Sequence, residues 1–278
     1  MNAPDNSIRG KAWFAALTGG LASKPGYSDA VLVADASLAG RPARFIAVVP
    51  DRNNRFPRVR NGEVGLVEGW EIAKAVQEII AQDSNSNRKT AIVAVIDVTS
   101  QAYGRREEGY GIHLALAAAA GAYASARLAG HAVIGLIVGK AISGAFLAHG
   151  YQANRLIAVN DPKVMVHAMG KESAARITLR SVEALEILAA TVPPMAYDIG
   201  NYASLGLLWR TLDLDDPDQP AAADLALVLT TLEEALADIA SDTDRGLNSR
   251  LGASNRQASS IVREKLRAQW LPPPSLTK

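Results

Sequence analysis

The feature that most constrains this chain is a short apolar run that leads without a break into small residues. Residues 133–138 are apolar, uncharged and rich in β-branched side chains, which is typical of a buried strand. Residues 139–150 begin with mostly small side chains up to Ala145, after which Phe146 and Leu147 introduce helical spacing. A buried strand that turns at once into a helix predicts a sheet covered by helices.

The start of such a helix is also chemically useful. Its first backbone N–H groups have no partner inside the helix, so they suit a developing negative charge such as a thioester enolate or a carboxylate. Only Gly, Ala or Ser lets a substrate approach that backbone closely, and residues 139–145 contain all three. We therefore interpret the segment 139–150 as the best candidate for an oxyanion-binding site. The alternative is plain close packing at a strand–helix junction.

Other segments alternate between strand and helix patterns. Two strand patterns flank a turn at residues 39–42, which predicts a hairpin. Residues 99–111 are expected to form a charged loop. Strands alternating with helices favour an α/β domain with right-handed crossovers. The expected elements are strands at 31–34, 44–49, 90–97, 132–138, 156–159 and 164–166, and helices at 66–80, 112–129, 181–191, 196–206 and 221–240.

Composition excludes several classes of function. The 278 residues carry a net charge of +1, which argues against a chain that binds nucleic acid or membrane surfaces. There is no cysteine, so disulfides, thiolate zinc sites and a cysteine nucleophile are excluded, and a cytoplasmic location is expected. The N-terminus lacks the apolar core of a signal peptide, and Arg127, Gly130 and His131 interrupt the apolar stretch 112–138, so no membrane span is expected.

The four histidines are evenly spaced, at His113, His131, His149 and His167. The chain between them changes secondary structure several times, so we interpret the spacing of 18 residues as coincidence and expect no metal site. The sequence also lacks HExxH, P-loop and GxGxxG patterns.

Three segments, in order along the chain, carry a resemblance to a known family. Residues 97–109 form a polar loop, residues 139–146 form the small-residue junction, and residues 161–166 follow a short strand. This order resembles the C-terminal half of the carboxyltransferase module of acyl-CoA carboxylases, a branch of the crotonase superfamily. The resemblance is closer to the gamma-subunit family of biotin-independent malonate decarboxylases, and residues 45–50 and 164–170 also carry it.

The resemblance implies a fold and a domain plan. The fold is expected to be the α/β, crotonase-like (ClpP/crotonase) spiral of ββα units, over residues 1–240. Residues 241–278 are expected to form a basic C-terminal tail. The loop residues 98–103 depart from the Pro-Gly-Phe of carboxyltransferases, which argues against a biotin pocket of the usual shape.

The resemblance also implies a reaction and its partners. The family decarboxylates malonyl that is carried as a thioester on the phosphopantetheine-type group of an acyl-carrier protein. This chain would supply one wall of the site and a beta subunit the other. No metal and no cofactor bound directly to this chain are expected.

The family mechanism suggests roles for residues near the junction. Gly144 and Ala145 become candidate backbone donors to the thioester oxygen, and Ser143 becomes a candidate partner of the leaving carboxylate or a proton carrier. Tyr103 and Gly104, on the neighbouring loop, become candidates to face the same charge. The alternative for Ser143 is a helix N-cap, and for Tyr103 it is packing across a subunit interface.

A second group consists of candidate substrate-binding residues. They are Gln101, Lys140, His149, Arg52, Arg55 and Arg58. The arginines suit the phosphate of a pantetheine arm or the acidic face of a carrier protein, and a solvated loop is the alternative. The alternatives are a turn role for Gln101 and a core position for His149. Glu107 and Glu108 are expected to cap the alanine-rich helix.

Two other functions fit the same residues. A stand-alone crotonase-fold hydrolase would use Ser143 as its nucleophile, although the flanking glycine of the usual nucleophile elbow is missing. A non-catalytic partner would only shape the site of the beta subunit, and its glycine-containing junction would serve packing alone.

Overall fold

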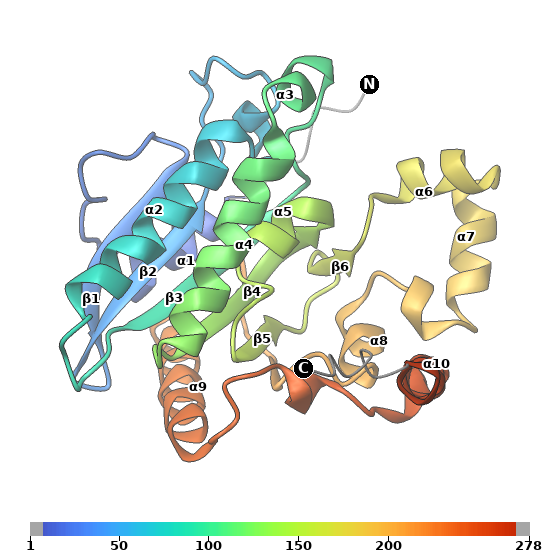
Figure 1. The fold of residues 1–278 in the computed structure, drawn as a ribbon. Coiled ribbons are helices and arrows are strands. Elements are labelled where there is room, and N and C mark those ends of the chain that lie inside the picture. Colours follow the sequence, from blue (N-terminus) through green and yellow to red (C-terminus); the bar gives the residue numbers. More distant parts are fainter. Residues whose placement is uncertain (1–7, 271–278) are drawn as a thin grey trace, which may run out of the picture.

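One sheet organises the chain, as Figure 1 shows. The structure is a computed structural model that describes residues 8–270, so residues 1–7 of the N-terminal segment and residues 271–278 of the expected tail lie outside the described residues. Within this range seven strands follow the order β1-β2-β3-β4-β5-β7, and β6 pairs with β4 outside that path. The strands are β1 (Val31–Leu38), β2 (Arg41–Val48), β3 (Ala91–Val98), β4 (Val133–Ile142), β5 (Arg155–Val159), β6 (Met165–His167) and β7 (Arg210–Leu212).

The first two strands form the expected hairpin, which is confirmed. They pair antiparallel, and the turn residues Ala39 and Gly40 have φ angles of 51° and 66°. Two consecutive positive φ angles are those of a type I′ turn, whose twist matches the twist of the strands. All other strand pairs are parallel, which requires crossover connections. The expected α/β architecture is therefore confirmed.

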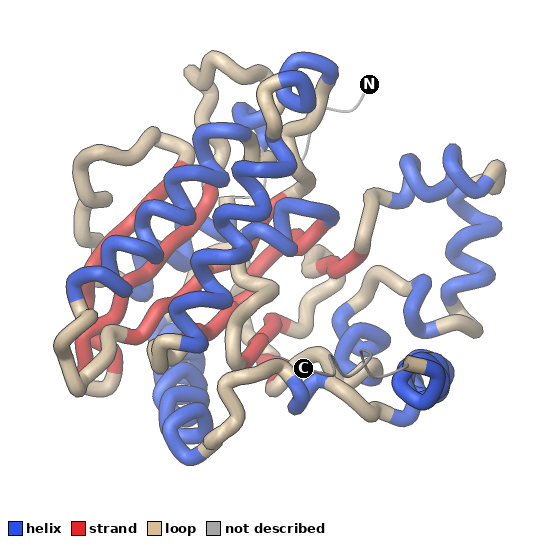
Figure 2. Tube along the Cα trace, viewed as in Figure 1, coloured by secondary structure: helices blue, strands red, loops and turns tan. Residues whose placement is uncertain are grey.

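Helices cover the sheet on two faces (Figures 1 and 2). The long helices α2 (Leu66–Gln82) and α4 (Ile112–Leu128) lie side by side on one face, while α1 (Arg9–Leu17) lies behind the sheet, against α9 (Ala222–Ser241). The α2–α4 contact is close at Gly69, because a Cβ atom there would lie 2.8 Å from the Ala115 backbone.

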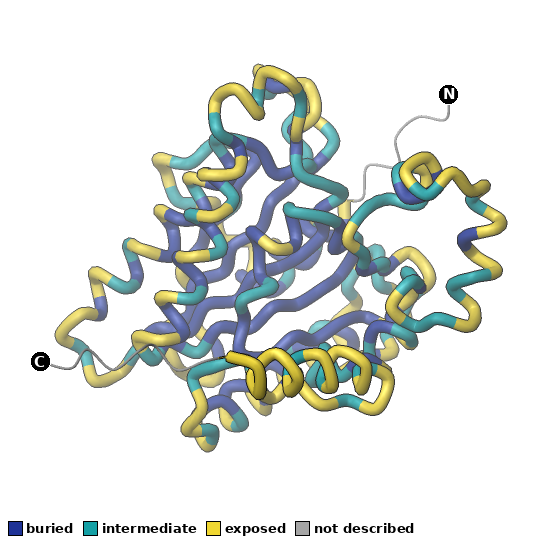
Figure 3. The backbone as a smooth tube through the Cα atoms, turned by 45° about the vertical axis from the view of Figure 1, so that its right-hand side comes forward, coloured by how far each residue is buried: buried dark blue, intermediate teal, exposed yellow. Residues whose placement is uncertain are grey.

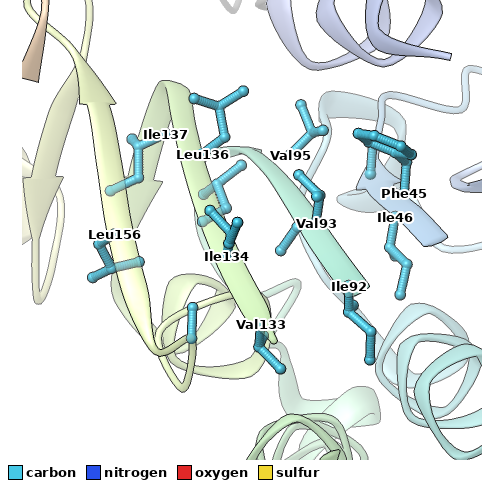
Figure 4. Close-up of a cluster of buried hydrophobic side chains, with 14 of the residues drawn as sticks. Phe45, Ile46, Ile92, Val93, Val95, Val133, Ile134, Leu136, Ile137 and Leu156 are labelled. Atoms are coloured by element: carbon cyan, nitrogen blue, oxygen red, sulfur yellow. The ribbon is translucent and has the colours of Figure 1, made fainter. Parts of the chain in front are cut away.

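The core lies between these layers. Every residue of β3 is buried, and Figure 4 shows side chains from β2, β3, β4 and β5 that pack side by side, including Phe45, Val93, Leu136 and Leu156. Figure 3 shows that burial is concentrated in the sheet, whereas α10 (Gln257–Gln269) is exposed along its length. The buried strands thus hold the residues at their C-terminal ends in fixed positions.

Shorter helices account for most differences from the expected elements. The charged loop 99–111 contains α3 (Arg105–Gly109), which includes Glu107 and Glu108, so these acids do not cap α4, whose N-cap is Gly111. Helices α1, α6 (Lys171–Thr178) and α10 and strand β7 were not expected from the sequence. The remaining helices are α5 (Ser143–Ala148), α7 (Val182–Ala189) and α8 (Ile199–Ser204), with 3₁₀ turns at Val59–Asn61, Pro193–Met195, Asn248–Arg250 and Ser254–Arg256.

The beginning of the segment expected as a tail is attached to the domain by arginines. Arg250 is buried and donates hydrogen bonds to the backbone carbonyls of Tyr151, at 2.6 Å, and Ala153. Arg127 donates in turn to the carbonyl of Arg245. Residues 245–250 are therefore bound to α4 through Arg127 and to the turn between α5 and β5 through Arg250.

Two kinds of feature are absent from residues 8–270. No helix in this range has both the length and the apolar character that crossing a bilayer requires. No three His, Cys, Asp or Glu side chains in the same range gather as metal ligands would.

Candidate functional site

The candidate site begins where β4 departs from regular pairing with β3. Ile96 pairs with Ile137, but Val98 pairs with Ala141, so β4 contains extra residues between these two pairs. Such a bulge bends a strand and changes the direction of the residues that follow. The expectation that this strand ends at residue 138 is wrong, because β4 continues beyond the bulge to Ile142.

A buried carboxylate holds the bulge. Asp97 accepts a hydrogen bond from the Lys140 N–H at 3.0 Å through one oxygen and from the Gly10 N–H at 3.1 Å through the other. A Cβ atom at Gly139 would lie 2.1 Å from the first of these oxygens. Position 139 therefore has no room for a side chain, and Asp97 links β3, β4 and α1 at one point.

Beyond the bulge, β4 changes its neighbour. Its residues 134–137 pair with β5, whereas residues 140–142 pair with β6. The end of β4 is thereby directed away from β5, and it leads straight into the short helix α5, as Figure 1 shows.

Ser143 forms the junction between β4 and α5. Its φ angle is +65°, a left-handed conformation that costs a non-glycine residue roughly 1–2 kcal/mol. The N-cap of α5 is Ile142, and the Ser143 hydroxyl has no hydrogen bond to any part of residues 8–270. The alternative role of Ser143 as a helix N-cap is therefore wrong, and its hydroxyl is left available.

The two expected backbone donors differ in access. Ala145 is fully buried, so of the pair only Gly144 reaches the surface. The Gly144 N–H donates to Oε1 of Gln101 at 2.9 Å. Since α5 has only six residues, this single amide, rather than a helix dipole, is the donor that the structure presents.

Backbone hydrogen bonds of its loop fix the position of Gln101. It forms an isolated parallel bridge with Val64, in which the Ala102 N–H donates to the Val64 carbonyl at 2.7 Å. The Gln101 carbonyl also accepts from the Tyr103 N–H at 2.9 Å, so the expected turn is present as well. The structure thus brings together Gln101 and Gly144, which lie 43 residues apart in the sequence.

The arginine loop reaches this region through one of its members. The Arg58 guanidinium carbon lies 5.1 Å from the centroid of the Tyr103 ring, and Nη1 lies 3.2 Å from a carboxylate oxygen of Glu63. Burial raises the pKa of Glu63 to about 7. Arg55 instead lies over Phe56 of its own loop. Arg58 is therefore the arginine that connects the loop with the candidate site.

The other predicted residues take more peripheral positions. Arg52 is exposed on its loop, and Tyr103 is 41% exposed. Gly104 is the N-cap of α3 with an extended backbone, φ −170°. Lys140 is half-buried, and its backbone N–H is the one that binds Asp97.

His149 belongs to the core. It is fully buried; its Nε2 lies 3.0 Å from the Val95 carbonyl and its Nδ1 3.1 Å from the Tyr123 hydroxyl. A carbonyl only accepts, so Nε2 carries the proton and Nδ1 accepts from the hydroxyl. Burial lowers the pKa of His149 to about 4. The expectation that His149 contacts substrate is wrong, and the core alternative holds.

One residue beside the site was missed by the sequence reasoning. His167, the last residue of β6, is the register partner of Ile142, which directly precedes Ser143. Its ring stacks on Tyr197, with centroids 4.0 Å apart and an interplanar angle of 16°. The family resemblance includes residues 164–170, but no local pattern indicates that the side chain of His167 lies beside the junction.

Comparisons with known proteins agree with this architecture. The chain is 65% identical to a chain of a Pseudomonas malonate decarboxylase hetero-tetramer crystallised with coenzyme A, over 94% of this chain and 99% of that one, with a TM-score of 0.91. It is 62% identical to a chain of the Pseudomonas MdcD–MdcE hetero-dimer, over the same shares of the two chains, with a TM-score of 0.87.

More distant relatives share the fold or part of the sequence. The transcarboxylase 12S, at 20% identity and a TM-score of 0.61 over 86% of this chain and 41% of that one, has the crotonase-like carboxyltransferase fold expected here, which is thereby confirmed. A malonyl-S-ACP:biotin-protein carboxyltransferase of Malonomonas rubra is 37% identical over 157 residues, which is 55% of this chain and about half, 54%, of that protein.

The sequence model of one family matches most of the chain. Residues 59–270 match the malonate decarboxylase gamma subunit, so the match continues well beyond residue 240 into the segment expected as a tail. With the identities of 62–65% to solved chains, this match decides the question of family. The chain belongs to the malonate decarboxylase gamma-subunit family.

Proposed function

We propose that this chain, together with a beta subunit, decarboxylates a malonyl thioester on an acyl-carrier protein to an acetyl thioester and CO2. The observation that carries the proposal is the Gly144 N–H, a partly buried donor in the first turn of α5 whose present acceptor is a side-chain carbonyl. The solved hetero-dimer and hetero-tetramer of Pseudomonas support a second subunit. A cytoplasmic location is part of the proposal and is compatible with the lack of cysteine.

The reaction needs a donor at the thioester oxygen. When the bond between the α-carbon and the carboxylate breaks, its electron pair moves toward the thioester carbonyl, and negative charge develops on that oxygen. A fixed N–H aimed at such an oxygen lowers the barrier by about 3 kcal/mol in related oxyanion holes. For Gly144 to act in this way, the thioester oxygen replaces Oε1 of Gln101 as its acceptor.

The displaced Gln101 side chain then has a second use. Its amide NH2 group is a donor, and the malonyl carboxylate is an acceptor that lies two bonds from the thioester carbon. Ser143, with a free hydroxyl at the adjacent position, offers a further donor to that carboxylate. Both contacts orient the bond that breaks.

The carrier protein delivers the substrate on a phosphopantetheine arm. Arg58 already lies over Tyr103 beside the site, and Arg52 and Arg55 are on the same loop. Arginine binds phosphate through paired N–H groups, so this loop suits the phosphate of the arm or an acidic face of the carrier. No cofactor bound directly to this chain is part of the proposal.

The test is reconstitution of the complex. The chain is co-expressed with a beta-type subunit, and release of ¹⁴CO2 is measured from carboxyl-labelled malonyl loaded on a phosphopantetheinylated carrier protein. Gly144→Val is expected to abolish turnover, because the valine side chain would crowd the place where the thioester oxygen must replace Oε1 of Gln101; a Cβ atom there would lie 3.2 Å from that oxygen. The matched control is Gly121→Ala, where a Cβ atom would meet no atom within 4 Å.

The outcomes separate this proposal from its alternatives. Loss of turnover in a Gly144→Val complex that still assembles, as shown by gel filtration, supports the proposed role. Full activity of that variant would favour a non-catalytic partner that only shapes the beta subunit's site.

A second candidate function follows from the Malonomonas relative, which is named for transfer of the carboxyl group to a biotin protein. Under that function the reaction would depend on an added biotinyl acceptor protein and would be blocked by avidin. We expect release of CO2 with neither dependence, because residues 98–103 differ from the carboxyltransferase loop.

A further inference from the structure

We propose that His167 is the catalytic acid that supplies the proton to the α-carbon after CO2 has left. This inference rests on the proposed function, since the decarboxylation creates the carbanion that must be protonated. Residues Met165–His167 of β6 place this side chain at the end of the strand nearest to the junction.

The backbone of His167 lies next to the junction between β4 and α5. His167 pairs with Ile142, and neighbouring strands lie about 4.8 Å apart. The two residues that follow Ile142 are Ser143 and Gly144, so the His167 backbone is one strand spacing from the chain that carries the proposed oxyanion donor. Gln101 approaches Gly144 from the loop after β3, whereas β6 pairs with the opposite edge of β4.

The orientation of the His167 ring is fixed. Nδ1 lies 3.0 Å from the Met169 carbonyl, and the Tyr197 hydroxyl donates to the same carbonyl at 2.9 Å. The Met169 N–H lies 3.3 Å from Nδ1, a longer contact, so we assign the proton on Nδ1 to the bond with the carbonyl. Stacking on Tyr197 restricts the ring from its face.

One ring nitrogen of His167 is available to a substrate. Nε2 of His167 has no hydrogen-bond partner in residues 8–270, and it is not among the buried unpartnered atoms, so it reaches solvent. His131 has a sealed Nε2, and both nitrogens of His149 are bonded in the core. His167 is therefore the histidine that combines a fixed ring with an open nitrogen.

The chemistry balances without a further reagent. The bond between the α-carbon and the carboxylate breaks, CO2 leaves, and the electron pair remains as the enolate. The protonated imidazole transfers its Nε2 proton to the α-carbon and becomes neutral, with Nδ1–H still bonded to the Met169 carbonyl. Solvent then protonates Nε2 again, so each turnover consumes one proton from water.

The surroundings suit an acid that must release its proton. Partial burial lowers the pKa of His167, while the hydrogen bond to Met169 opposes that shift. The nearby charges are mixed. Nζ of Lys171 lies 5.5 Å from the centroid of the Tyr197 ring and 2.7 Å from a carboxylate oxygen of Glu186. The other charged residues are Glu172 on α6, Asp198 before α8 and Lys140 on β4.

The experiment uses the assembled complex with two matched variants. His167→Asn keeps a side-chain donor for the Met169 carbonyl, and His113→Asn removes an exposed histidine of α4. We expect His167→Asn to lower kcat about 100-fold or more with little change in KM, as for loss of a general acid. We expect added imidazole to restore part of the rate, and His113→Asn to behave as the parent chain.

Two further readouts exclude a structural role. In the parent complex kcat is expected to fall as the pH rises above the pKa of His167, and this limb is expected to be absent in His167→Asn. The parent complex is also expected to exchange the methyl hydrogens of an acetyl thioester with D2O, and the variant to do so about 100-fold more slowly. That exchange involves no CO2, so it reports the proton step independently of the proposed decarboxylation.

Several results would overturn the assignment. They are unchanged exchange in His167→Asn, a lowered rate with an unaltered pH profile and no imidazole rescue, or fluorophosphonate labelling of Ser143 that depends on His167. The last result would make His167 the base of a nucleophilic serine. If the parent complex exchanges methyl hydrogens but releases no CO2, the proposed function fails while the role of His167 in proton transfer stands.

Discussion

Gly139→Ala tests whether the bulge in β4 positions the candidate site. The new Cβ atom would lie 2.1 Å from an oxygen of Asp97 and 2.4 Å from its carboxyl carbon, so the carboxylate must leave its place. Its two hydrogen bonds, from the N–H groups of Lys140 and Gly10, are then lost in a buried region. Hydrogen bonds to a charged group contribute about 1.5–3 kcal/mol each, so the free energy of unfolding is expected to fall by about 3–6 kcal/mol.

The assay is thermal unfolding followed by circular dichroism. For a chain of this size 1 kcal/mol shifts Tm by about 2–4 °C, so a decrease of roughly 6–24 °C is expected. Gly121→Ala is the control, because a Cβ atom there meets nothing within 4 Å and alanine favours the helix by up to about 1 kcal/mol. The complex with Gly139→Ala is also expected to lose activity below its Tm. A Tm within about 2 °C of the parent value would refute the argument that Asp97 and Gly139 fix the bulge.

Three further predictions concern the site and its support. Gln101→Glu is expected to raise KM at least about 5- to 30-fold in steady-state kinetics, since a carboxylate holds the Gly144 N–H about 1–2 kcal/mol more tightly than a neutral carbonyl does and the variant also loses the NH2 donor to the malonyl carboxylate; an unchanged KM would contradict both proposed contacts. A fluorophosphonate probe is expected to leave Ser143 unlabelled in mass spectrometry, because no base is hydrogen-bonded to its hydroxyl in residues 8–270. The pKa of His149 is about 4 in the folded chain, below its ordinary value of 6.5. Between these two values the unfolded chain binds a proton that the folded chain does not. The free energy of unfolding that is present above pH 6.5 is therefore expected to fall by about 3 kcal/mol as the pH falls toward 4. Urea unfolding of His149→Gln between pH 7 and pH 4 is expected to show a smaller loss, and equal losses in the two chains would contradict the assignment.

The elements with a strong apolar pattern could be predicted from sequence. The run at 133–138 is a buried strand, and the helices at 66–80 and 112–129 are α2 and α4 with small changes at their ends. In these segments the spacing of apolar side chains reflects burial against the sheet, so the local pattern contains the necessary information.

The extension of β4 could not be predicted in the same way. A Gly-Lys pair is more typical of a turn than of a strand, yet Lys140 continues the strand because Asp97 binds its N–H and β6 supplies a second neighbour. Helix α10 was missed for the opposite reason, because none of its residues is buried and its sequence is mostly polar.

The sequence also could not reveal which of the predicted site residues are exposed to a substrate. Ala145, in α5, and His149, directly after it, belong to the segment that was expected to carry the site, but both are buried in the core. The contact between Gln101 and Gly144, and the pairing of His167 with Ile142, join segments that are distant along the chain. Such contacts depend on tertiary packing, which local spacing does not encode.

The change of pairing partner along β4 separates a segment that stabilises the core from a segment that lies beside the candidate site. Residues 134–137, between β3 and β5, are locked into the apolar interior, where one added methyl group disturbs many contacts. In place of β5, residues 140–142 pair with a strand of only three residues, but Ala141 and Ile142 are themselves buried, and only Lys140 is partly exposed. An engineer who wishes to alter the reaction therefore has the Lys140 side chain as the position on this strand to change, because its backbone N–H, and not its side chain, binds Asp97.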